Sequence, residues 1–464
     1  MVDNRCDLVV LGGGSGGYAA ALRAAELGKS VVLVEKDKVG GTCLHRGCIP
    51  TKALLHAGEI ADQARESAAF GVKTTFEGID MPGVHKYKDS VIAKNHKGLT
   101  GLIKGRGIKI AEGEGRLTGP KTVQVGADTY TGTNLVLATG SYSRTLPGLD
   151  LDGDRVMASE HALALDRVPA TAIVLGGGVI GCEFASAWTS FGSKVTIVEG
   201  LPHLVPLEDE ASSKLLEREF RRRGIGFKLG VRFERAEPAG DGVRVQLSGG
   251  ETLDAELLLV AVGRGPVSAG LGYEEQGVRV DRGFVAVDEY CRTSAEGVYA
   301  VGDLVSTNDG VHPQLAHVGF AEGIGVAEHL AGLPVVPIDY PGVPRITYSH
   351  PEVASVGYTQ AQAAEKYGGD NITTVSYDLS GNGRSSILGT KGAVKVIAAK
   401  DGPVLGIHIV GDRVGELIAE AQLIYNWEAL PAEVARLINP HPTQSEAIGE
   451  AHLLLAGKPL HVHA

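Results

Sequence analysis

Two stretches of the chain share one order of apolar and polar positions. In the first, the short apolar run Cys6 to Leu11 meets a glycine-rich turn, the helical pattern Tyr18 to Leu27, and a second apolar run, Ser30 to Val34, that ends at Glu35. A strand, a helix and a second strand in this order predict a βαβ unit.

The same order returns further along the chain. Ile173 to Leu175 is followed by a glycine-rich turn, a predicted helix through Phe191, and the strand Lys194 to Val198 that ends at Glu199. Such an internal repeat predicts two nucleotide-binding modules of one architecture.

Each predicted unit carries the pattern G-x-G-x-x-G at its first turn. The first two glycines let the backbone approach a pyrophosphate, the third lets helix and strand pack closely, and the helix N-terminus stabilises negative charge. Glu35 and Glu199 each lie 23 residues after the first glycine of their motif, where a carboxylate suits a pair of ribose hydroxyls. One such motif could be a turn that binds nothing, but two in register indicate two dinucleotides. The motif positions are Gly12, Gly14 and Gly17, and then Gly176, Gly178, Ile180 and Gly181.

The residues after Glu199 bear on the second nucleotide. A 2′-phosphate would need Arg or Lys near the end of this strand, but the chain continues with Gly200 to Pro206, in which His203 is the nearest potential cation. A carboxylate at this position repels an additional phosphate. The sequence therefore favours NAD over NADP.

Composition narrows the class of protein. The 464 residues suit about three domains, and 43% hydrophobic with 21% charged residues is ordinary for a soluble protein. Glycine accounts for 65 residues, about twice its usual share, which fits tight turns and phosphate-binding loops.

A net charge of -11 argues against nucleic acid and acidic membranes as partners, and the longest basic run, Arg221 to Arg223, is expected on a solvated helix face. Met1 to Val10 does not resemble a signal peptide, and no run is long enough to span a bilayer, so we expect a cytoplasmic protein.

The segment Gly40 to Lys52 carries the candidate chemistry. It reads GGTCLHRGCIPTK and holds two cysteines five positions apart, Cys43 and Cys48. A disulfide between them would close too small a loop to add much stability, so it suits redox chemistry better than stapling. Two alternatives are half of a zinc site, which has no partner cysteine pair elsewhere in the chain, and two inert buried thiols.

Several segments together resemble the flavoprotein disulfide reductases, and in particular the members that oxidise dihydrolipoamide. They are Gly40 to Lys52, the two glycine motifs, Ala138 to Gly140, Val262 to Arg264, Val298 to Asp303, Pro344 to Gly357, and His441 to Glu446. The resemblance implies an α/β fold with two Rossmann-like domains, for FAD and NAD, and an α+β C-terminal dimerisation domain. The implied boundaries are 1–148 for the FAD domain, 149–267 for the NAD domain, 268–340 for a segment that completes the FAD domain, and 341–464 for dimerisation.

The resemblance also implies roles for individual residues. Cys43 would exchange with substrate, Cys48 would face the flavin with Lys52 near it, and Asp303 would hold the ribityl chain. Leu315, Ala316 and His317 would open a helix beneath the flavin, although an ordinary helix start is the alternative. Glu183 would lie near the nicotinamide, unless it is a carboxylate on the helix surface. Further implied cofactor contacts are Gly41, Thr42, Gly115, Thr139, Gly140, Gly263 and Arg264.

His441 is the candidate base. It stands between Pro440 and Pro442, which stiffen the backbone, and an imidazole can take up and release a proton near neutral pH. Thr443 to Glu446 can be a capping box, whereas the resemblance makes Glu446 the carboxylate that orients His441. Many dihydrolipoamide-oxidising members carry histidine where this chain has Asn439, which leaves the surroundings of the base open.

These roles together imply an enzyme that oxidises dihydrolipoamide through Cys43 and Cys48, with FAD and NAD as cofactors and no metal. It would be the E3 component of a 2-oxoacid dehydrogenase complex, with a lipoyl-bearing acyltransferase or carrier protein as its partner. A homodimer with active sites shared between subunits is implied as well. The alternatives are a sister reductase for another disulfide or a quinone, and a non-catalytic nucleotide-binding scaffold.

Overall fold

The computed structural model describes residues 3–307 and 313–462. The chain divides into two compact units, each assembled from three stretches of sequence. The first unit takes residues 1–53, 82–144 and 263–340, and the second takes 54–81, 145–262 and 341–464. Each half therefore combines segments that lie far apart along the chain.

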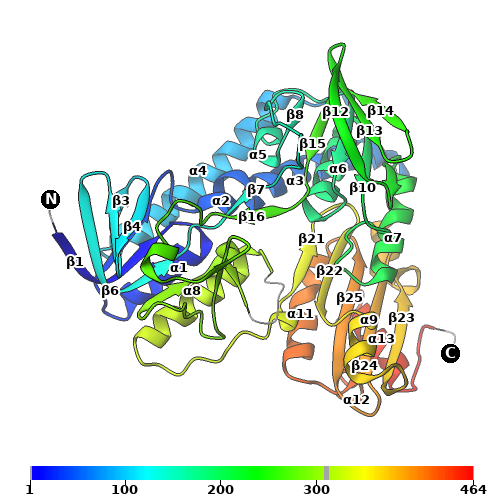
Figure 1. The fold of residues 1–464 in the computed structure, drawn as a ribbon. Helices are drawn as coiled ribbons and strands as arrows, with labels where there is room; N and C mark the ends of the chain where they lie inside the picture. Colours follow the sequence, from blue (N-terminus) through cyan, green and yellow to red (C-terminus); the bar gives the residue numbers. More distant parts are fainter. Residues whose placement is uncertain (1–2, 308–312, 463–464) are drawn as a thin grey trace. The chain divides into compact units, whose positions relative to one another are not determined.

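The first unit is built on a seven-stranded sheet with the order β3-β2-β1-β6-β5-β4, in which β19 also pairs with β6. Figure 1 labels β1, β3, β4 and β6 of this sheet. The strands β3, β2, β1, β6 and β19 run parallel, and β5 and β4 extend the sheet antiparallel. The first predicted βαβ unit is confirmed, since α1 (Ser15–Glu26) connects β1 to β2. The strands are β1 (Asp3–Leu11), β2 (Val31–Glu35), β3 (Lys109–Glu112), β4 (Gly115–Gly119), β5 (Thr122–Val125), β6 (Asp128–Leu137) and β19 (Val298–Ala300).

Glycines allow α8 (Ala316–Leu330) to pack closely on α1. A Cβ atom at Gly323 would lie 2.3 Å from the carbonyl oxygen of Gly16, so only glycine fits this helix contact. Two apolar clusters fill the unit, and they include Leu8 and Val10 of β1 and Val9 and Leu11 on its other face. Short sheets add β7 (Ser141–Ser143) with β16 (Arg264–Pro266), and β17 (Val280–Asp281) with β18 (Phe284–Ala286) and β20 (Val305–Ser306).

The second unit holds the repeated module. Five parallel strands follow the order β11-β10-β9-β15-β8, and α6 (Val179–Phe191) connects β9 to β10, which confirms the second predicted βαβ unit. A small antiparallel sheet, β12-β13-β14, contributes Val243 and Leu247 to the same core. The elements are β8 (Val156–Met157), α5 (Ser159–Ala162), β9 (Thr171–Leu175), β10 (Lys194–Glu199), α7 (Glu210–Arg222), β11 (Gly226–Leu229), β12 (Phe233–Ala239), β13 (Gly242–Leu247), β14 (Thr252–Ala255) and β15 (Leu257–Val260).

The C-terminal part of the second unit is an antiparallel sheet with helices, as the α+β expectation requires. Its strand order is β21-β22-β25-β24-β23 (Figure 1). Every residue of β25 is buried. Ile418 of α11 and Ile448 of α13 belong to the apolar cluster that covers the sheet. The elements are β21 (Arg345–Thr347), β22 (Glu352–Gly357), α9 (Gln360–Tyr367), β23 (Ile372–Asp378), α10 (Gly383–Leu388), β24 (Ala393–Ala399), β25 (Val404–Gly411), α11 (Val414–Asn426), α12 (Pro431–Val434) and α13 (Glu446–Leu455).

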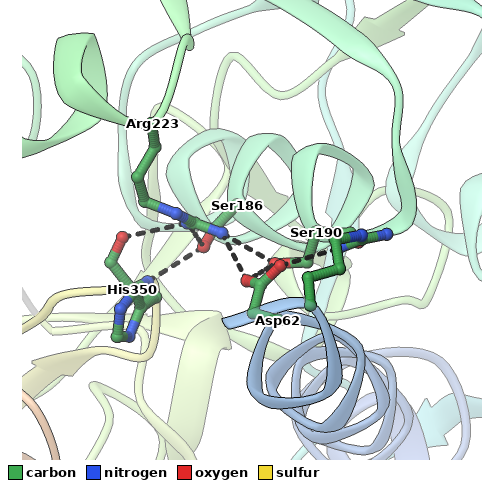
Figure 2. Close-up of polar contacts among 6 residues, drawn as sticks. Asp62, Ser186, Ser190, Arg223 and His350 are labelled. Atoms are coloured by element: carbon green, nitrogen blue, oxygen red, sulfur yellow. Dashed lines mark hydrogen bonds and ion pairs between the residues drawn. The ribbon is translucent and has the colours of Figure 1, made fainter. Parts of the chain in front are cut away.

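A polar network connects three helices of the second unit, and Figure 2 shows it. Arg223, directly after α7, donates to Asp62 (2.9 Å) near the end of α3 (Cys48–Glu66) and to Ser190 (2.7 Å) of α6. It also donates to Ser186 (2.7 Å) and to the carbonyl oxygen of His350 (3.0 Å). The expectation that the basic run lies on a solvated face is therefore wrong for Arg223, because its charge is balanced by a carboxylate that is distant in sequence.

None of the helices in the described ranges is both long and apolar enough to cross a bilayer.

Candidate active site

The cysteine segment folds into two consecutive helices. Cys43 lies in α2 (Gly41–Arg46), Gly47 separates the helices, and Cys48 is the first residue of the 19-residue α3. Both cysteines are free thiols, and a hydrogen bond joins their side chains. The break between the helices thus brings two sulfurs that are five positions apart into direct contact.

The surroundings of the two thiols differ in charge. The hydrogen bond with Cys48, reinforced by burial, raises the pKa of Cys43, and the charge of Asp303 acts in the same direction while Lys52 opposes both. Cys48 stands at the positive end of the α3 dipole, which stabilises negative charge on its sulfur.

Sequence reasoning missed Tyr18, whose pKa rises to about 12 through burial and the nearby cysteines. Its ring lies 5.5 Å from that of Phe320 in α8, and no sequence pattern pointed to this position.

The cysteine segment rests directly on the first glycine turn. A Cβ atom at Gly41 would lie 2.7 Å from the Cα of Gly14, and the Gly40 N–H donates to the Gly13 carbonyl oxygen (2.8 Å). Gly40 and Gly41 both have positive φ, at 108° and 57°. Glycine is needed here so that the thiol segment can approach the turn, and the structure brings together the two motifs that the sequence separates.

Both glycine turns have the shape that a dinucleotide requires. In the first turn, a Cβ atom at Gly12 would meet the Ala138 carbonyl oxygen at 2.3 Å and one at Gly17 would meet the Gly12 carbonyl oxygen at 1.8 Å, whereas Gly14 faces open space. The third glycine therefore serves close packing, and the middle one leaves room for a pyrophosphate at the N-terminus of α1.

The second turn repeats this geometry. A Cβ atom would meet the Ala261 carbonyl oxygen at 2.3 Å from Gly176 and the Gly176 carbonyl oxygen at 1.9 Å from Gly181, and Gly178 again faces open space. The residues present thus fit two dinucleotides, one in each unit. Ile180, half-buried at the start of α6, lies beside this turn.

The two strand-terminal acids also hold the turns. Glu35 accepts a hydrogen bond from Gly13 N–H (2.7 Å), and Glu199 accepts one from Gly177 N–H (2.6 Å). Their other oxygens accept from Asp37 and Leu201 backbone N–H groups, both at 2.8 Å. Because a carboxylate has about four acceptor sites, each acid can still receive a ribose hydroxyl.

His203, the nearest potential cation beyond Glu199, is engaged elsewhere. Its Nδ1 lies 3.1 Å from a carboxylate oxygen of the buried Glu217, and its Nε2 lies 3.7 Å from Glu210. A histidine held between two carboxylates is a poor site for an additional phosphate.

Asp303 anchors a polar group in the first unit. It lies in the short 3-10 turn η3 (Gly302–Leu304), accepts a hydrogen bond from Ser141 Oγ (2.5 Å), and lies 3.9 Å from Arg264 Nε. Arg264 in turn donates to Ser141 Oγ (2.7 Å), so the predicted residues Asp303 and Arg264 meet through a serine that sequence reasoning missed.

The other residues predicted to contact the cofactor in the first unit differ in exposure and in the contacts they make. The Thr139 hydroxyl donates to the Val267 carbonyl oxygen (2.6 Å) and shares a hydrogen bond with the Tyr273 hydroxyl (3.0 Å), and a Cβ atom at Gly115 would meet three apolar side chains. A contact of either residue with the cofactor stays a prediction. Leu315 precedes α8 as its N-cap, and Gly140 and Gly263 have positive φ and face open space. Ala316 and His317 form the first turn of α8, and Thr42 and His317 are exposed.

Glu183 is not a surface carboxylate, which excludes the alternative considered for it. It is buried in α6, with 2% exposure, and accepts a hydrogen bond from the Tyr348 N–H (3.0 Å) in the segment that follows β21. A contact between Glu183 and nicotinamide stays a prediction.

His441 and Glu446 form the expected pair. His441 Nδ1 lies 2.9 Å from Glu446 Oε1, and its side chain is 77% exposed. Because a carboxylate only accepts, Nδ1 carries the shared proton and Nε2 is left as the basic atom. Burial raises the pKa of Glu446, but hydrogen bonds from Thr443 N–H and His441 outweigh it and lower that pKa.

Both interpretations of Glu446 hold in part. Its second oxygen accepts from Thr443 N–H (2.8 Å), which is half of a capping box, while the Thr443 hydroxyl bonds to Pro440 and Ser445 and does not cap α13. Asn439 packs over this helix, since its Nδ2 lies 2.4 Å from where a Cβ atom of Gly449 would stand. The segment that carries His441 is thus fixed to α13 at two points, through Glu446 and through Asn439.

Among the described residues, no group of three or more His, Cys, Asp and Glu side chains is arranged to hold a metal ion.

Comparisons with known proteins agree with this geometry. Residues 6–323 match the pyridine nucleotide-disulphide oxidoreductase family, and residues 343–452 match the dimerisation domain of that family. The chain is 40% identical to a dihydrolipoyl dehydrogenase of Bacillus subtilis, over 98% of this chain and 99% of the relative. It is 37% identical to a leghemoglobin reductase of Glycine max, over 98% and 88%.

A solved structure shares the fold over nearly its whole length. The crystal structure of LpdA from Mycobacterium tuberculosis superposes with a TM-score of 0.89 at 29% identity, covering 97% of this chain and 99% of that one. The predicted fold class is confirmed, and the matched dimerisation domain indicates a homodimer. The chain belongs to the pyridine nucleotide-disulphide oxidoreductase family.

Proposed function

We propose that the protein oxidises dihydrolipoyl groups to lipoyl groups and reduces NAD, with FAD as the bound redox cofactor. The observation that carries this proposal is the contact between the Cys43 and Cys48 thiols on the first glycine turn. Relatives that span the whole chain and are named dihydrolipoyl dehydrogenase support the choice of substrate.

The thiol pair performs the exchange with substrate. Starting from the Cys43–Cys48 disulfide, one substrate thiolate attacks the Cys43 sulfur, so that a mixed disulfide forms and the bond to Cys48 breaks. The second substrate sulfur then displaces Cys43. The substrate leaves as a cyclic disulfide, and its two electrons remain on the Cys43 and Cys48 thiols.

His441 accepts and returns the proton in this exchange. Dihydrolipoamide thiols are mostly protonated at neutral pH, and a thiolate is the attacking species. Nε2 of His441 takes the thiol proton while Glu446 holds Nδ1 and balances the charge of the imidazolium. Glu446 thereby fixes the tautomer that leaves the basic atom facing solvent and substrate.

The two glycine turns hold the cofactors. Gly12 to Gly17 with Glu35 would bind FAD, and Gly176 to Gly181 with Glu199 would bind NAD. Bound FAD supplies two-electron chemistry that connects a dithiol to a nicotinamide. Asp303 and Lys52, whose charges both act on Cys43, would contact the FAD on the thiol side.

Two copies of the chain complete the site in this proposal. The thiol pair belongs to the first unit and His441 belongs to the second, within the region that matches the dimerisation domain. We propose that the partner subunit's His441 serves the Cys43–Cys48 pair of each subunit. A lipoyl-bearing acyltransferase or carrier protein of a 2-oxoacid dehydrogenase complex, in the cytoplasm, would supply the substrate.

Substitution of single cysteines tests the proposal. C43S and C48S should each abolish NADH formation from dihydrolipoamide, while C6S, which changes a half-buried thiol in β1, should keep it. All three should still reduce a quinone dye with NADH, because that reaction needs only the nucleotide sites. Turnover of dihydrolipoamide by C43S would contradict the role assigned to the thiol pair, whereas a wild-type protein that does not turn it over would favour another reductase of the family.

A further inference from the structure

Glu322 is a buried carboxylate that the reaction described above does not use. It lies in the middle of α8 with 2% exposure. A charge in such a place is costly unless it is hydrogen-bonded, and Glu322 accepts from Gly302 N–H (2.6 Å) through Oε2 and from the Tyr340 hydroxyl (2.8 Å) through Oε1.

The bond to Gly302 acts on the turn that carries Asp303. Gly302 opens η3 with a φ of 76°, and the residue that follows it is Asp303. The Asp303 carboxylate accepts from Ser141, and its backbone carbonyl oxygen accepts from the Gln314 side chain (3.2 Å) just before α8. Glu322 therefore holds the start of the turn whose next residue is expected to contact FAD.

The same turn lies close to the thiol pair. The charge of Asp303 contributes to the raised pKa of Cys43, so a displacement of Asp303 reaches the cysteines as well as the cofactor. The two oxygens of Glu322 thus have separable roles. The oxygen that accepts from Gly302 acts on the redox site. The oxygen that accepts from Tyr340 holds the last residue of the first unit against α8.

We propose that Glu322 is a positioning residue, whose buried carboxylate holds the Gly302 N–H and thereby sets the place of Asp303 beside the cofactor and the thiol pair. The inference rests on the proposed function, because it assigns the effect of Asp303 to bound FAD. It predicts that breaking the Gly302 bond changes the redox site, whereas breaking the Tyr340 bond does not.

Three variants of the holoenzyme separate these roles. E322A removes both bonds, and Y340F removes only the second. E322Q keeps both, since its amide oxygen can accept from Gly302 and its amide N–H can donate to the Tyr340 oxygen. FAD release is followed by flavin fluorescence on dilution, and the alkylation of Cys43 by iodoacetamide is followed against pH in the reduced protein. Thermal unfolding of each variant reports its stability.

E322A should release FAD about tenfold faster than the wild type, as expected when a charged hydrogen bond is lost, and its alkylation profile should move to lower pH. E322Q should restore both readouts, and Y340F should lower the unfolding temperature without changing either. Wild-type FAD release and alkylation in E322A, or equal changes in Y340F, would overturn the inference. If E322A does not fold, E322L gives the same comparison, because an apolar side chain of similar size fills the buried position and accepts from neither Gly302 nor Tyr340. A wild-type protein that holds no FAD would instead refute the proposed function.

Discussion

Glu446 uses its two oxygens for different tasks. One oxygen orients His441 and the other closes the turn at Thr443, so the same carboxylate serves both the base and the start of α13. The capping pattern could be predicted from the spacing of Thr443 and Glu446, because a capping box is local. The link to His441 could not be derived from spacing alone, and only the family resemblance pointed to it.

Replacing Glu446 by glutamine separates these tasks. E446Q keeps an acceptor for Thr443 N–H but loses the charge that balances a protonated His441, so kcat with dihydrolipoamide should fall roughly 10- to 100-fold. Steady-state kinetics at neutral pH measure this, with T443V as a control that changes the turn but keeps the carboxylate. Unchanged kcat in E446Q would contradict the role assigned to the charge.

The same variant has a stability signature in pH. The pKa of Glu446 is lowered in the folded protein, so its ionised form contributes stability that is present above the unfolded value of about 4.3 and is lost as pH falls through the folded value. The gap in unfolding temperature between wild type and E446Q should therefore shrink on acidification below about pH 4. A gap that is constant with pH would contradict this linkage.

At the scale of elements, Arg223 connects the end of α7 to α3 and α6. Three consecutive arginines predict a solvated stretch, because the residues around them do not indicate that Arg223 contacts Asp62, which is 161 positions away. By contrast, both βαβ units could be predicted, since apolar runs and glycine spacing are local signals. The closeness of Glu322 to Gly302 and of Ser141 to Asp303 depends on packing between distant segments, and so it lay beyond prediction.

A matched pair of substitutions tests this difference between neighbouring arginines. R223M keeps the apolar stem but removes the donors to Asp62, Ser186 and Ser190, and it should cost about 2 kcal/mol of unfolding free energy. R222M removes the pair between the exposed Arg222 and the largely covered Glu219, which Arg218 also contacts (3.1 Å), so it should cost less than about 0.5 kcal/mol. Urea denaturation of both variants provides the comparison. Equal losses would mean that the network contributes no more than a surface ion pair.

At the scale of the whole molecule, the candidate catalytic and cofactor-binding residues are divided between the two units. The thiol pair and the first glycine turn belong to one unit, while the second turn and the His441–Glu446 pair belong to the other. Each unit is assembled from three stretches of sequence, which local patterns cannot assign. The family resemblance implies that residues 268–340 complete the FAD domain, and this boundary stays a prediction. The first unit includes residues 263–340, and the second includes residues 54–81.

The most direct test of the central claim is the rate of nucleotide reduction by dihydrolipoamide. The purified protein would be mixed anaerobically with dihydrolipoamide and either NAD or NADP, and the appearance of reduced nucleotide would be followed by absorbance. NADH should form rapidly and NADPH far more slowly, because Glu199 and the engaged His203 disfavour a 2′-phosphate. No reaction with dihydrolipoamide, together with NADPH-dependent reduction of another disulfide, would contradict both the substrate and the nucleotide assignments.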